Sequence, residues 1–92
     1  MTRYLIEVPH ANSKFACMQA VRAFMATGSH FMTNAEWGCA DDVHKAWFFV
    51  DLESKEQALS LLPPLLRQDA QVITLQRFDP ENLQDTLEHH SE

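Results

Sequence analysis

The chain has 92 residues, of which 46% are hydrophobic and 22% charged, and this size and composition are typical of one globular domain. No apolar run approaches the roughly 20 residues of a membrane helix, and no basic-then-apolar signal segment opens the sequence, so we expect a cytoplasmic protein outside the membrane. The net charge is −6, and it is uneven: the last 14 residues contain five acidic residues and no Lys or Arg. The rest of the chain is nearly neutral and has no basic stripe, which argues against a nucleic-acid-binding surface.

The first part of the sequence predicts a strand, a helix and a second strand. Residues 3–8 read as a strand, and Asn12 or Ser13 can cap the helix that follows. Gly28 is placed to end that helix in a left-handed conformation, and residues 29–37 then read as the second strand. The helix is indicated by apolar residues at helical spacing, namely Cys17, Met18, Val21, Phe24 and Met25.

The predicted third strand, residues 43–52, is apolar on both of its faces. Side chains alternate across a strand, and here the two sets are Ala46, Phe48 and Val50, and Trp47 and Phe49. Two helices on so short a chain can cover one face of a sheet. The second face therefore needs another cover, and we expect either a homodimer formed through the sheet face or a cavity that encloses a ligand.

A second helix is predicted to begin after Ser54, because Gln57 three residues later completes a capping-box pattern. Pro64 lacks an amide hydrogen and strains the preceding turn, so this helix should stop near Leu62. Its apolar stripe is formed by Ala58, Leu61, Leu62, Leu65 and Leu66.

The last strand is predicted at residues 70–78, and Asp79 followed by Pro80 is a helix-start signal. We therefore divide the chain into one domain, 1–78, and an acidic C-terminal helix or tail, 79–92.

The order of these elements predicts an α+β fold of the ferredoxin-like βαββαβ type. Right-handed crossovers give a four-stranded antiparallel sheet in the order 4-1-3-2, with two helices on one face and a short C-terminal helix in addition. The apolar third strand then takes a central position in the sheet.

With this layout the chain resembles the dimeric α/β-barrel superfamily, in which small ferredoxin-like chains pair through their open sheet faces. The second half of the chain is similar in layout to muconolactone isomerase-like proteins, through Trp47-Phe48-Phe49-Val50-Asp51-Leu52-Glu53-Ser54, then Ala58-Leu59, then Leu61-Leu62-Pro63-Pro64-Leu65. The stretch Glu36-Trp37-Gly38-Cys39 followed by His44 resembles small uncharacterised bacterial domains of this type. The resemblance implies a homodimer, and it carries no catalytic residue over to this chain.

Four side chains with ligand or acid/base chemistry are expected at one edge of the sheet: His10, Glu36, Cys39 and His44. The first and second predicted strands end at this edge and the third begins there, with Asp41 and Asp42 in the turn. In one interpretation His10, Cys39 and His44, with or without Glu36, bind zinc or another transition metal, since imidazole, thiolate and carboxylate suit zinc. In another they are surface loop residues, and in a third a histidine acts as a general base without metal.

A second group follows from the alternation along the predicted second strand. His30, Met32, Asn34 and Glu36 would share the open face of the sheet beside Trp47, and this mixed polar and apolar lining is typical of a small-molecule pocket. The alternative is an edge strand whose outer face is solvated. The other set, expected to face the helices, comprises Phe31, Thr33, Ala35 and Trp37.

The sequence leaves three functions open. The first is a dimeric domain that binds a small, partly apolar molecule and performs cofactor-independent isomerisation or proton transfer, with His10, Glu36 or His44 as acid/base and Trp47 as a pocket wall. The second is a non-catalytic metal-binding or sensing module that uses His10, Cys39 and His44. The third is a structural domain that binds a protein partner.

Overall fold

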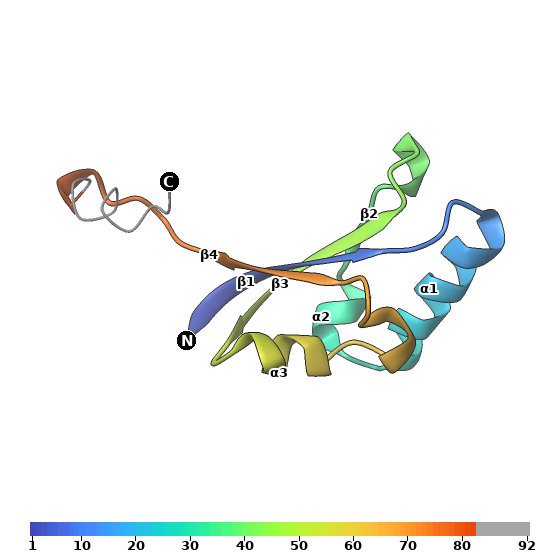
Figure 1. Ribbon diagram of the computed structural model, residues 1–92, viewed down its shortest axis with the longest axis horizontal. Helices are drawn as coiled ribbons and strands as arrows, with labels where there is room; N and C mark the ends of the chain where they lie inside the picture. Colours follow the sequence, from blue (N-terminus) through green and yellow to red (C-terminus); the bar gives the residue numbers. More distant parts are fainter. Residues whose placement is uncertain (83–92) are drawn as a thin grey trace.

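Two long strands form the centre of the sheet in the computed structural model, which describes residues 1–82. β1 (Thr2–Pro9) and β3 (Lys45–Leu52) pair antiparallel over their whole length (Figure 1). β4 (Gln71–Leu75) pairs antiparallel with β1, and the two-residue β2 (Glu36–Trp37) pairs antiparallel with β3. The resulting order, β2-β3-β1-β4, is the predicted order read from the opposite edge, so the antiparallel α+β sheet is confirmed.

The two predicted helices begin where the sequence places their caps, and α1, α2 and α3 all lie on one side of the sheet in Figure 1. The Ser13 Oγ accepts a hydrogen bond from the Ala16 N–H at 3.0 Å, and the Ser54 Oγ accepts one from the Gln57 N–H at 3.2 Å. Gly28 has a φ of 66° directly after the first helix, as its predicted role requires. The helical elements are α1 (Lys14–Ala26), α2 (His30–Thr33), α3 (Lys55–Ser60) and the 3-10 turns η1 (Cys39–Asp41), η2 (Pro64–Leu66) and η3 (Pro80–Asn82).

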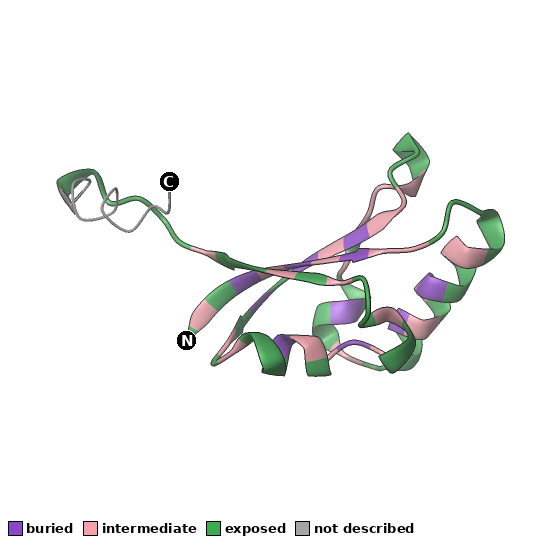
Figure 2. Ribbon diagram, viewed as in Figure 1, coloured by how far each residue is buried: buried purple, intermediate pink, exposed green. Residues whose placement is uncertain are grey.

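The hydrophobic core lies between the helices and one face of the sheet. Buried and less buried residues alternate along β1 and β3 (Figure 2), and the buried set on β3 is the one that contains Phe48. Phe24 of α1 is fully buried, with its ring at 4.9 Å from that of Trp37 and 5.9 Å from that of Phe48. The core is completed by Tyr4, Ile6, Val8, Met32, Ala46, Val50, Ala58 and Leu62.

The opposite face of the sheet carries an apolar row across three strands. Leu5 of β1 lies opposite Phe49 on one side and Ile73 on the other. Phe49 and Ile73 are 52% and 40% exposed, so this row is open to solvent in the single chain. The Arg3 guanidinium lies 4.7 Å above the Phe49 ring and covers part of it.

The predicted strand at residues 29–37 is wrong over most of its length. Residues His30–Thr33 form the short helix α2, and only Glu36–Trp37 pair with β3. The helix is held by its own polar groups, because the Asn34 side-chain amide donates to the His30 carbonyl at 2.8 Å. It also places Met32 in the core with no exposed surface. The predicted inward set is therefore changed, since Phe31 and Thr33 are exposed.

The predicted C-terminal helix falls largely outside the described residues. Its first turn is η3, where the Glu81 N–H donates to the Asp79 Oδ1 at 2.9 Å. The helix start predicted at Asp79 and Pro80 is therefore present as one 3-10 turn, which is described as far as Asn82.

Candidate metal centre

Two segments that are distant in sequence, the end of β1 and the loop that leads from β2 into β3, meet at one edge of the sheet. The His10 N–H donates to the His44 carbonyl at 3.0 Å, which continues the β1–β3 pairing by one step. The loop between β2 and β3 carries η1 and is tied back to Gly38, whose carbonyl accepts from the Asp41 and Val43 N–H groups at 3.0 Å. Backbone hydrogen bonds thus fix the end of β1 and the β2–β3 loop relative to each other.

The loop leaves no room for a side chain at its first position. A Cβ on Gly38 would lie 2.7 Å from the Val43 carbonyl oxygen and 2.9 Å from the Trp47 ring. At its other end Asp42 takes the left-handed conformation with a φ of 60°, which aspartate tolerates better than most residues. This tight turn is what brings Cys39 and His44 to the same side.

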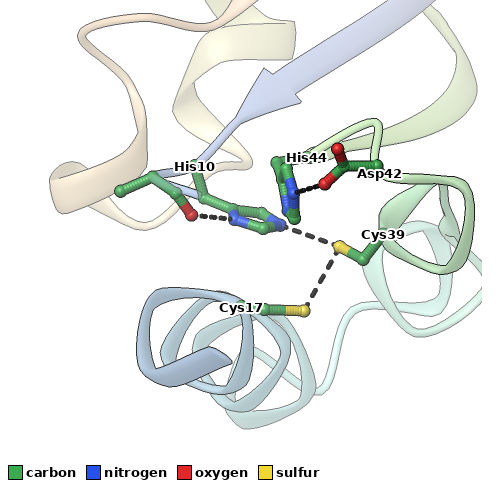
Figure 3. Close-up of polar contacts among 6 residues, drawn as sticks. His10, Cys17, Cys39, Asp42 and His44 are labelled. Atoms are coloured by element: carbon green, nitrogen blue, oxygen red, sulfur yellow. Dashed lines mark hydrogen bonds and ion pairs between the residues drawn. The ribbon is translucent and has the colours of Figure 1, made fainter. Parts of the chain in front are cut away.

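His10, Cys39 and His44 form a cluster that can hold a metal ion. One ring nitrogen of each histidine and the Cys39 Sγ all lie within 4.8 Å of one another (Figure 3). The His10 Nε2 is 3.1 Å from the Cys39 Sγ, and the two imidazole ring centres are 5.5 Å apart. Two atoms bound to one tetrahedral zinc are separated by about 3.3–3.8 Å, given Zn–N and Zn–S bonds of about 2.0–2.3 Å. Small side-chain rotations would therefore bring all three to one ion.

The hydrogen bonds of His10 fix its tautomer. Its Nδ1 lies 2.9 Å from the Ala11 carbonyl oxygen, which can only accept, so Nδ1 carries the hydrogen. In the neutral ring Nε2 then has a free lone pair, and this atom faces Cys39. A histidine that donates one ring N–H to a backbone carbonyl and offers the other nitrogen is the usual arrangement in metal sites.

His44 shows the same division between its two nitrogens. Its Nε2 donates to the Asp42 Oδ1 at 2.8 Å, while Nδ1 is buried. Among residues 1–82, this Nδ1 is the one buried side-chain nitrogen or oxygen without a hydrogen-bond partner. Buried polar atoms are rarely left unpaired, because doing so costs about 1–3 kcal/mol. A metal ion bound to Nδ1 would remove this cost.

The thiol of Cys39 lies between the His10 imidazole and the Cys17 thiol. Burial raises its pKa, and the nearby Cys17 thiol raises it further through a hydrogen bond and through charge repulsion. The Cys17 Sγ donates to the Cys39 Sγ at 3.2 Å, and both cysteines are free and half-buried. A metal that binds the Cys39 sulfur would displace the thiol proton.

Glu36 and most of the second predicted group lie elsewhere. A cavity of about 710 Å³ beside β3 is lined by His30, Asn34, Glu36 and Trp47, together with Leu5, Phe31, Phe48 and Phe49. Met32, predicted to share this lining, lies in the core instead because α2 replaces the expected strand. The predicted acid/base residues are thus divided, since Glu36 lines this cavity while His10 and His44 lie in the cluster.

Cys17 borders the cluster through its contact with Cys39, and the sequence analysis assigned it to a different role. Its helical spacing with Val21 and Phe24 placed it on the apolar stripe of α1, yet its side chain points to Cys39 (Figure 3). The signal that could have found it is the Ser13 cap. This cap sets the first turn of α1 at the same edge of the sheet as His10, and Cys17 lies in that turn.

No family model, curated protein or solved structure matches the chain. Within residues 1–82, none of the helices has the length and apolar character needed to cross a membrane.

Proposed function

We propose that this chain is a metal-binding module that holds one zinc ion through the His10 Nε2, the Cys39 Sγ and the His44 Nδ1. The observation that carries the proposal is the buried and unpaired His44 Nδ1, which lies within the only group of potential ligands found among residues 1–82. Its Nε2 is already hydrogen-bonded to Asp42, so Nδ1 is the ring nitrogen that remains to bind a metal.

The donor set favours zinc over the other common metals. Imidazole nitrogen and thiolate sulfur suit zinc, whereas calcium and magnesium prefer oxygen ligands. Both histidines have an acceptor for their second ring N–H, the Ala11 carbonyl for His10 and the Asp42 carboxylate for His44. Such outer partners orient the rings and raise their basicity as ligands.

The position of the cluster suggests what a bound ion would do. It would join the end of β1, the η1 loop and the start of β3, which lie at the open end of the sheet. A chain of 92 residues has a small core, and a metal that binds only the folded state adds its binding free energy to stability. We therefore assign the module a non-catalytic role, in which a bound metal holds the end of β1, the η1 loop and the start of β3 in one conformation.

Zinc uptake by the untagged, reduced protein tests the proposal directly. We expect one zinc per chain by elemental analysis, and a rise of the melting temperature by more than roughly 10 °C when free zinc exceeds Kd 100-fold. The His30→Ala variant is the matched control, because His30 is an exposed histidine outside the cluster and should leave uptake unchanged. A wild-type protein that takes up no metal from zinc-replete solution would refute the proposal.

The open face of the sheet supports a second candidate function. We propose that the ferredoxin-like arrangement pairs with a second copy through the row of Leu5, Phe49 and Ile73, and that the adjoining cavity then takes a small, partly apolar molecule. The support is the exposure of this row and the mixed lining of the cavity, to which His30, Asn34 and Glu36 contribute together with Trp47. Glu36 would act there as the acid/base group of an isomerisation or proton transfer that needs no cofactor.

Trp47→Ala tests this second candidate. The Trp47 indole N–H donates to the Glu7 Oε1 at 3.1 Å, and its ring forms a wall of the cavity. We expect the variant to weaken self-association by at least roughly tenfold, since interface aromatic residues often contribute more than 1.4 kcal/mol. Analytical ultracentrifugation measures this, with exposed Leu65→Ala as the control away from the sheet face. A wild-type protein that stays monomeric at millimolar concentration would exclude the dimer.

A further inference from the structure

We infer that Cys17 supplies the fourth ligand of the cluster, which makes it a closed Cys2His2 zinc site with no open coordination position. This inference rests on the proposed zinc-binding function and deepens it, because the fourth ligand decides what such a site can do. The sequence offered no metal-ligand spacing for Cys17, and the assignment comes from where α1 places its thiol.

The geometry of the two thiols is the first argument. The Cys17 Sγ is 3.2 Å from the Cys39 Sγ, and the latter is 3.1 Å from the His10 Nε2 (Figure 3). Two sulfur ligands on one tetrahedral zinc lie about 3.8 Å apart, given Zn–S bonds of about 2.3 Å. The two thiols need to separate by about half an ångström to share an ion. Cys17 lies outside the group of ligand atoms that are all within 4.8 Å of one another, so its side chain must also rotate toward the histidines to complete the site.

The chain of hydrogen bonds is the second argument. Cys17 donates to Cys39, which in turn faces the free lone pair of His10, so the protons of both thiols point along the line of the cluster. When zinc replaces these protons, the two thiolates neutralise its double charge, and neither is left as an unpaired buried anion.

The position of Cys17 on α1 is the third argument. It is the fourth residue of a 13-residue helix, so it lies in the first turn, where unpaired N–H groups favour negative charge. The opposite thiol, Cys39, is on the loop, so a bound ion would connect a helix to a loop.

A closed site has a clear functional consequence. Zinc sites with four protein ligands are structural, while catalytic zinc keeps one position for water or substrate. With Cys17 as a ligand, the ion would fasten α1 to the β2–β3 loop and to the end of β1. Hydrolytic chemistry at this centre is then excluded, because no coordination position is left for water. The presence or absence of zinc would instead determine how firmly α1, the β2–β3 loop and the end of β1 are held together.

X-ray absorption and thiol alkylation of the reduced full-length chain test the inference. With zinc bound, we expect two sulfur and two nitrogen ligands, and protection of both cysteines from alkylation as read by mass spectrometry. Cys17→Ser should lower zinc affinity by at least roughly tenfold, by analogy with the 10–100-fold cost of losing groups that only support a ligand. Met18→Ala is the matched control, because Met18 is the next residue on α1 and is 44% exposed.

The outcomes separate this inference from the function on which it rests. Zinc uptake with one sulfur ligand and a Cys17 that is alkylated as fast as in the metal-free protein would overturn the four-ligand site and leave three-ligand binding standing. Absence of any uptake by the wild-type chain would overturn both. If Cys17→Ser does not fold, the absorption and alkylation measurements on the wild-type chain still decide, because they need no variant.

Discussion

The His44→Ala variant is expected to lose high-affinity zinc binding, with Kd raised by more than roughly 100-fold. Loss of a group that only supports a ligand already costs about 10–100-fold in affinity, and His44 is a direct ligand in the proposed site. The substitution also removes the one buried side-chain nitrogen without a partner in residues 1–82. We therefore expect the metal-free variant to keep the stability of the wild-type chain or to gain slightly.

A competition titration against a zinc chelator measures this effect, and thermal unfolding without metal measures the stability. Asp42→Asn provides the graded comparison. It keeps the size of the side chain that accepts from the His44 Nε2 but removes its charge, so its Kd should fall between those of the wild type and His44→Ala. Equal affinity of all three proteins would show that His44 is not a ligand.

Phe24→Ala is expected to lower the free energy of unfolding by about 3–5 kcal/mol, the usual cost of removing a large buried aromatic side chain. Phe24 has no exposed surface, and it packs between Trp37 of β2 and Phe48 of β3. The Trp37 ring is in turn 6.0 Å from that of His10, so the cavity left by Phe24 would border the metal centre. A loss of this size is a large fraction of the stability of a small domain.

Urea unfolding followed by tryptophan fluorescence and circular dichroism measures the difference. Phe15→Ala is the matched control, because Phe15 lies on the same helix but is 71% exposed. Its effect should stay within about 0.5 kcal/mol. Similar losses in the two variants would mean that α1 does not pack on the sheet through Phe24.

Most of the sheet could be predicted from the sequence because its signals are local and redundant. β1 and β3 are strongly apolar, and the helices are marked by Ser13 and by Ser54 with Gln57. The segment 29–37 was mispredicted because its alternation fits a strand as well as a helix over so few residues. The deciding contact is the burial of Met32, and this depends on tertiary packing that no local pattern encodes.

The candidate site, like the sheet, could be predicted only in part from the sequence. The topology alone was sufficient to predict that His10, Cys39 and His44 meet, since strand ends and a hairpin determine one edge of a sheet. The roles of Cys17 and Asp42 depend on side-chain direction, and Cys17 also has a spacing that suits an apolar helix face. Glu36 is divided from the histidines because it pairs with Trp47 and lines the cavity on the open face of the sheet.

The order of the strands has a consequence for how the chain folds during synthesis. β1 is made first, yet both of its partners come later, and β4 is complete only at Leu75. The central strand therefore waits for the C-terminal part of the chain, and long-range pairing of this kind slows folding. His10, Cys17, Cys39 and His44, the proposed ligands, are all present once His44 has left the ribosome. An ion bound at that stage would close the first large loop of the fold before the last strand exists.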